Sequence, residues 1–160
     1  MGFEPGQDDV LVLGVGNPLS GDDAAARGVV ELLKEHRLPP HVYLQQAGTP
    51  GLALPNWLEG WRSVVLVDAV ELGGAPGSWR RFAPEEVRLI AQDEALSLHE
   101  PGLADGLALT QALDMLPERI VLYGIQPAEI EPGALLSQQV SARLPEVVDQ
   151  ILNDLGKCEA

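Results

Sequence analysis

Two short and almost wholly apolar segments constrain the fold of this chain more than any other feature. They are residues 10–16 (VLVLGVG) and residues 63–70 (SVVLVDAV). Continuous hydrophobicity, as opposed to an alternating pattern, is typical of strands that are buried on both faces of a parallel sheet. After Ser63, the second segment meets no polar side chain until Asp68. The two segments therefore predict central strands of an α/β protein.

The rest of the chain alternates helical and extended patterns, which implies right-handed crossovers. We expect a first helix that has Asp22 and Asp23 in its first turn and ends near Arg37, because Ala26, Val29, Val30 and Leu33 share one helical face. Further elements are expected as strands at 42–44, 78–82 and 119–125, and as helices at 52–58, at 101–115 and up to Leu155, the last one kinked at Pro145. The predicted fold is a three-layer α/β/α sandwich whose sheet of about five strands is mostly parallel, with one antiparallel edge strand.

Length and charge limit the class of protein. The 160 residues predict a single domain, with flexible ends at 1–9 and 156–160. A net charge of −14 disfavours nucleic acid as a partner. The acidic start and the lack of a long apolar run predict a cytoplasmic protein with no membrane insertion. The single cysteine, Cys158, allows no intrachain disulfide and is interpreted as an exposed thiol without a role.

Loops at the carboxyl ends of the strands are where ligands bind in open parallel sheets. Residues 14–19 (GVGNPL) resemble a dinucleotide fingerprint, but the third glycine is missing. Two aspartates, Asp22 and Asp23, also stand where a pyrophosphate would bind, so a nucleotide is disfavoured. We expect Asp22 to cap the first helix and Asp23 to point to the sheet edge.

Three residues are expected at that same edge: Asp23, Asp68 and His99. Taken singly, each has an ordinary structural explanation, such as a capped loop or a hydrogen-bonded histidine. Taken together, they form a mixed oxygen and nitrogen set that could hold a divalent first-row metal and leave coordination positions open. The sequence has no HExxH helix and no GxSxG elbow, which argues against a zinc peptidase and a serine hydrolase.

Four motifs occur in order along nearly the whole chain. They are 13–23 (LGVGNPLSGDD), 67–70 followed by 74–77 (VDAV and GAPG), 97–103 (SLHEPGL), and 124–127 followed by 130–133 and 136–137 (GIQP, IEPG and LS). This collinear set resembles the hydrogenase maturation proteases, which are endopeptidases that trim the large subunit of nickel-iron hydrogenases. Two positions depart from the usual pattern: alanines at 24–26 replace glycines, and Gln46 stands where an aspartate often precedes the Gly-Thr pair.

The resemblance implies a function and a set of site residues. Asp23, Asp68 and His99 would face a metal, and Asp23 or Asp68 would activate water as a general base. Asn17, Gly48 and Thr49 would contact the substrate. The expected reaction removes a C-terminal extension from a nickel-iron hydrogenase large-subunit precursor after nickel insertion. The resemblance also implies that the nickel arrives with the substrate. The residues fit this, because two carboxylates and an imidazole are few ligands for a permanent ion, and no permanently bound cofactor is expected.

The precursor is thus the expected partner, and the protease is expected to be a monomer. Two other functions remain open at this point. One is a small-molecule or nucleotide-binding α/β domain, in which residues 14–16 would approach a ligand. The other is a chaperone that holds the tail of the precursor without cutting it.

Overall fold

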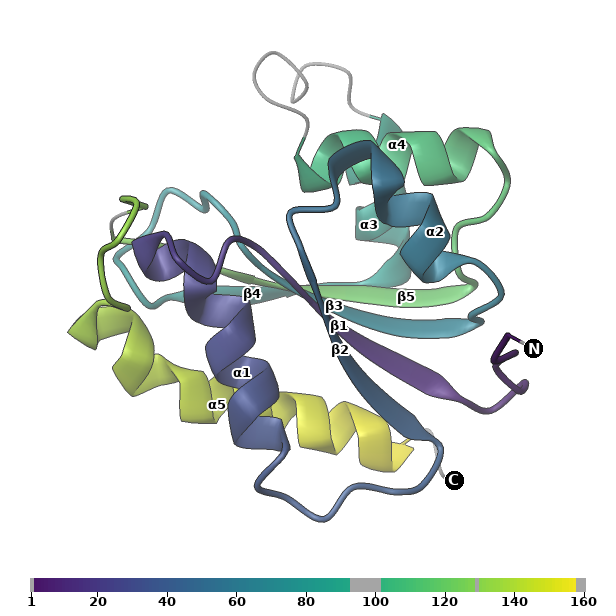
Figure 1. The fold of residues 1–160 in the computed structure, drawn as a ribbon, viewed down its shortest axis with the longest axis horizontal. Coiled ribbons are helices and arrows are strands. Elements are labelled where there is room, and N and C mark those ends of the chain that lie inside the picture. The colour runs from purple at the N-terminus through teal and green to yellow at the C-terminus, as the bar shows by residue number, and fades with distance from the viewer. Residues whose placement is uncertain (1, 93–101, 129, 158–160) are drawn as a thin grey trace.

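The computed structural model describes residues 2–92, 102–128 and 130–157. Strands and helices alternate along these residues except that β4 follows β3 directly and α4 follows α3 (Figure 1). In chain order the elements are β1 (Val10–Val15), η1 (Gly21–Ala24), α1 (Ala25–Leu33), β2 (Val42–Gly48), η2 (Gly51–Ala53), α2 (Leu54–Leu58), β3 (Ser63–Ala69), β4 (Trp79–Phe82), α3 (Pro84–Gln92), α4 (Leu103–Ala112), β5 (Arg119–Ile125) and α5 (Gln138–Lys157).

One five-stranded sheet has the strand order β2-β1-β3-β5-β4. The first four strands in this order are parallel to one another, and β4 pairs antiparallel with β5 at the edge. The mostly parallel sheet with one antiparallel edge strand is therefore confirmed. The central strands β1 and β3 are the two continuously apolar segments, and nearly all their residues are buried.

Helices cover both faces of the sheet, which explains why its central strands lack an alternating pattern. Helices α1 and α5 pack on one face, where Val12, Val65 and Tyr123 belong to the core (Figure 1). Helices α2, α3 and α4 lie on the other face, where residues of the same strands, such as Leu11 and Leu66, belong to a second core (Figure 1). The three-layer α/β/α architecture is thus as predicted.

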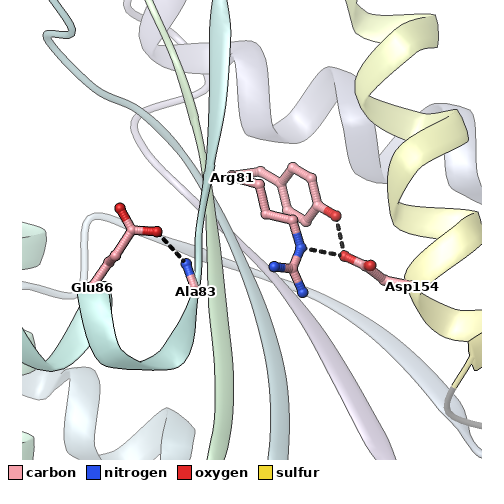
Figure 2. A network of polar contacts seen from close by, with 5 residues as sticks. Arg81, Ala83, Glu86 and Asp154 are labelled. Atoms are coloured by element: carbon pink, nitrogen blue, oxygen red, sulfur yellow. Dashed lines mark hydrogen bonds and ion pairs between the residues drawn. The ribbon is translucent and has the colours of Figure 1, made fainter.

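Hydrogen bonds connect the antiparallel edge strand β4 and the residue after it to α5 on one face of the sheet and to α3 on the other (Figure 2). Arg81 Nε lies 2.8 Å from Oδ2 of Asp154 on α5, and the Tyr123 hydroxyl donates to the same carboxylate. Directly after β4, the Ala83 backbone N–H donates to Glu86 Oε1 in the first turn of α3 (3.1 Å). Burial and the Asp154 carboxylate raise the pKa of Tyr123, so this phenol stays protonated as a donor.

The sequence prediction missed helix α3 altogether. The signals were present, because Pro84 is the first residue of the helix and Glu85 and Glu86 occupy its first turn. Other boundaries moved: α1 ends at Leu33, before Arg37, and the expected strand at 42–44 continues to Gly48. Helix α4 begins at Leu103, after Gly102.

Helix α5 runs without interruption through Pro145, and the kink expected there stays a prediction. The helix continues to Lys157 and so includes the first two residues of the tail that was expected to be flexible.

Near the other end of the chain, the ring centroid of Phe3 lies 5.0 Å from that of Tyr43. Within the described residues, no helix is long and apolar enough to cross a membrane. Cys158 lies outside the described residues.

Candidate active site

The carboxyl ends of β1, β3 and β5 meet at one edge of the sheet, and the loops that follow them are hydrogen-bonded to one another or to neighbouring strands. The Val70 N–H, just after β3, donates to the Ile125 carbonyl at the end of β5 (2.9 Å). The Gly16 N–H, just after β1, donates to the Gly48 carbonyl at the end of β2 (2.6 Å). This edge is the one at which the sequence places the candidate site.

Asp23 lies in η1, directly after the loop that follows β1. The Asn17 backbone N–H donates to its Oδ2 atom at 2.6 Å, which fixes one carboxylate oxygen. The tight turn depends on Gly16, whose φ is +130°. A Cβ atom at this position would lie 2.2 Å from the Asp23 carbonyl oxygen, so only glycine allows the loop to approach Asp23 so closely.

Gly16→Ala is therefore expected to displace Asp23 and to lower the free energy of unfolding by about 2 kcal/mol or more. Chemical denaturation measures the effect. Gly156→Ala is the matched control, because a Cβ at this helical position meets no atom within 4 Å. Equal stabilities of the Gly16→Ala variant and the parent would show that the loop relaxes freely around the new methyl group.

Asp68 lies near the end of β3 and has only 9% of its surface exposed. Burial raises the pKa of Asp68 well above its usual value, and the negative charge of Asp23 raises this pKa further. A hydrogen bond from the Ala69 backbone opposes these effects. The two carboxylates thus interact through their charges, and none of the ion pairs among the described residues includes either of them.

Asp22 does not cap a helix, contrary to the sequence prediction. Only 1% of its surface is exposed, and no side-chain cap is present at η1 or α1. Its carboxylate instead accepts hydrogen bonds from the Ala128 N–H, the Ser137 N–H and the Ser137 hydroxyl, each at 2.7 Å. Asp22 therefore ties the loop after β1 to the loop after β5, because backbone donors from that loop surround it.

Gln126 is a second buried polar residue at this edge, and the sequence analysis gave it no role. Its Oε1 atom accepts from the Leu72 N–H at 2.6 Å, and its Nε2 atom donates to Glu71 Oε1 at 2.9 Å. Gln126 thus connects the loops after β3 and β5. Its position directly after a buried strand was the available signal.

Three of the other expected site residues, Asn17, Gly48 and Thr49, lie within the described part of the chain. The Asn17 side-chain oxygen accepts from the Leu19 N–H (2.9 Å), which makes a local turn. Gly48 ends β2 with a φ of +66° and open space where a side chain would be, and Thr49 is exposed beside it. His99 lies outside the described residues, and the described ones contain no group of three metal-ligating side chains.

The sequence of this chain matches a known protein family. The profile of the family described as hydrogenase maturation protease matches residues 28–154, which is most of the chain. The chain belongs to this family. The protein is therefore a peptidase, and the resemblance noted in its sequence motifs is confirmed.

Individual members of the hydrogenase maturation protease family agree in sequence and fold. The hydrogenase expression/formation protein HupD of Rhodobacter capsulatus is 34% identical over 155 residues, which cover 96% of this chain and 73% of that protein. The hydrogenase 2 maturation protease of Escherichia coli K12 is 32% identical, with 89% of this chain and 88% of that one covered. The solved structure of the E. coli hydrogenase maturating endopeptidase HybD superposes with a TM-score of 0.79 at 31% identity and covers 93% of both chains.

Proposed function

We propose that this maturation protease removes a C-terminal extension from the large-subunit precursor of a nickel-iron hydrogenase after nickel has been inserted. The observation that carries the proposal is the pair Asp23 and Asp68 at the ligand-binding edge of the sheet. Asp68 is buried, and the negative charge of Asp23 raises its pKa further. Membership of the maturation protease family supports the same reaction.

The pair offers a general base for hydrolysis of a peptide bond. A carboxylate of Asp23 or Asp68 takes a proton from water while the water oxygen attacks the scissile carbonyl carbon. The same group then returns the proton to the leaving nitrogen, which departs as an amine when the C–N bond breaks. A raised pKa makes a carboxylate a stronger base, and burial raises the pKa of Asp68.

Nickel enters the proposed reaction as part of the substrate. Asp23 and Asp68 are oxygen donors that repel each other, and no lysine or arginine of the described residues pairs with them. A divalent cation between them would relieve that repulsion. With His99 as a third donor the set would still leave coordination positions open, which suits an ion already held by the precursor.

The substrate-binding residues we propose are Asn17, Gly48 and Thr49. Gly48 and Thr49 lie where β2 ends beside Gly16, and the space over the Gly48 Cα atom is open to a peptide. Asn17 follows Gly16 and holds Asp23 through its backbone N–H. The proposal further places the reaction in the cytoplasm, with the protease as a monomer that binds one precursor chain.

The proposed function is tested by incubating the protein with nickel-loaded and metal-free large-subunit precursor and measuring the intact masses of the products. We expect a shortened large subunit only from the nickel-loaded precursor. A precursor that stays intact in both samples, together with a higher unfolding temperature in micromolar nucleotide, would favour a nucleotide-binding domain. An intact precursor that binds tightly would favour the non-cleaving chaperone.

His99→Ala is expected to weaken the binding of nickel-loaded precursor while it changes the free energy of unfolding by no more than about 1 kcal/mol. The reason is that the imidazole would contribute a metal ligand and little packing. Calorimetric titration with the precursor and thermal unfolding measure the two effects. His36→Ala is the control, because His36 is exposed just after α1. A collapse of stability in the His99→Ala variant would assign His99 a structural role instead.

A further inference from the structure

A cavity of about 510 Å³ opens beside Asp68, on the face of the sheet that carries α3 and α4. The end of β3, the loop after it, β4, β5, α3 and the start of α4 supply its walls. Its larger apolar lining residues are Val70, Leu72, Phe82, Ile90, Leu103 and Leu122. The cavity is of the size that holds one or two side chains of a bound peptide.

Each charged side chain that lines this cavity has a partner, which for Asp68 is the Ala69 backbone. Arg80 forms an ion pair with Glu86 and lies over the Phe82 ring, 4.4 Å from its centroid. Glu71 accepts a hydrogen bond from Gln126, and Asp105 accepts one from the Gly102 N–H (3.0 Å). The surface that remains for a ligand is therefore mainly hydrocarbon.

The wall formed by residues 70–72 is held in place by Gln126. This side chain is buried and binds both the Leu72 N–H and the Glu71 carboxylate. The Gln126 backbone also binds the far end of the same loop, since its N–H donates to the Ser78 carbonyl and its carbonyl accepts from the Gly77 N–H (2.8 and 2.9 Å). The wall is thus preorganised before any ligand arrives.

We propose that this cavity is a specificity pocket for an apolar side chain of the precursor, on a residue that flanks the scissile bond. The inference rests on the proposed function, because Asp68 is placed at the cut. Consecutive Cα atoms are about 3.8 Å apart, so a bond held at Asp68 puts a neighbouring side chain within reach of the cavity. A charged side chain there would lose much of its hydration, and the apolar part of the lining cannot replace it.

The first test replaces Leu72 by aspartate, which puts a negative charge on the Gln126-held wall. We expect kcat/KM for the nickel-loaded native precursor to fall at least about tenfold, as expected when an apolar pocket is disrupted. Leu103→Asp places the same charge on the part of the lining that α4 supplies and should act alike. Leu89→Asp is the control, because Leu89 lies on α3 with 65% of its surface exposed and does not line the cavity.

A charge swap identifies the side chain that the pocket receives. Each of the two precursor residues that flank the cleaved bond is replaced by lysine in turn. At one of the two positions the wild-type protease should cut the lysine precursor at least about tenfold more slowly, and the Leu72→Asp variant should cut it faster than the wild type does. Thermal unfolding is measured for every variant. If both aspartate variants unfold, Leu72→Ala replaces them, and the enlarged pocket should shift preference toward a bulkier apolar residue.

The outcomes separate the two proposals. Failure of the wild-type protein to cut the nickel-loaded native precursor would overturn the proposed function itself. If the wild-type protein cuts but the Leu72 and Leu103 variants fold and process native and lysine precursors at wild-type rates, the pocket inference alone is overturned. The same holds if Leu72→Ala leaves the preference for residue size unchanged.

Discussion

Asp68→Asn is expected to lower the rate of precursor cleavage about 100-fold or more, and also to raise the stability of the free protein at neutral pH. The rate falls because an amide is neither a general base nor a charged ligand. The stability rises because an ionised carboxylate is costly at this buried position next to Asp23, as the raised pKa of Asp68 shows. An isosteric amide removes that cost and fills the same volume.

The stability gain has a defined pH dependence. The pKa of Asp68 is higher in the folded protein than in the unfolded chain, so the folded state holds the proton more tightly. The free energy of unfolding of the parent therefore falls as the pH rises from about 4 through the folded-state pKa. Below about pH 4 the parent is protonated in both states, and the advantage of the Asp68→Asn variant should vanish.

Thermal unfolding in chelator between pH 3.5 and pH 8 measures this difference. Asp149→Asn is the control, because Asp149 is an exposed carboxylate on α5 and should leave both cleavage and the pH profile unchanged. A variant of Asp68 that is less stable than the parent at pH 7, or that yields mature large subunit at the normal rate, would contradict the account.

Asp22→Asn is expected to lower the free energy of unfolding by about 2 to 4 kcal/mol, although Asp22 neighbours Asp23 in the sequence. The Asp22 carboxylate accepts three short hydrogen bonds inside the protein, from Ala128 and Ser137. An amide accepts on one side only, and its NH₂ group would face donors that lose their partner. A carboxylate that only capped a helix could be replaced by asparagine at little cost, because Asn caps about as well as Asp, so the tertiary hydrogen bonds are the reason for the larger expected loss.

Urea-induced unfolding measures the cost of the Asp22→Asn substitution. Ser137→Ala is a graded comparison, because it removes one donor to Asp22 and the weaker acceptor of the Val140 N–H (3.3 Å), and it should cost about 1 to 2 kcal/mol. A variant of Asp22 as stable as the parent would show that the buried carboxylate does not hold the loops together.

The sheet could be predicted because the physical reasons for it are local. The apolar runs that became β1 and β3 have no polar face, so they had to lie in the middle of a covered sheet. Asp68 could also be placed from the sequence, because it is the polar residue at the carboxyl end of the apolar run that forms β3. Helix α3 was missed although its proline and acidic first turn were local signals.

The roles of Asp22 and Gln126 could not be predicted, because their partners are distant in the sequence. Asp22 binds donors 106 and 115 residues further along the chain, and Gln126 binds the loop 54 residues before it. Local capping rules assign Asp22 to the nearest free amides, whereas the folded chain offers it three donors from another loop. Tertiary hydrogen bonds thus decided which aspartate is structural.

The most direct test of the central claim, that Asp23 and Asp68 act together in cleavage, is the intact mass of nickel-loaded precursor after incubation with the Asp23→Asn variant. The new amide oxygen can still accept the Asn17 N–H that now binds Asp23 Oδ2, so the loop should keep its structure. The account predicts a folded variant, within about 1 kcal/mol of the parent, that leaves the precursor at full length. Mature large subunit formed at the wild-type rate would contradict it.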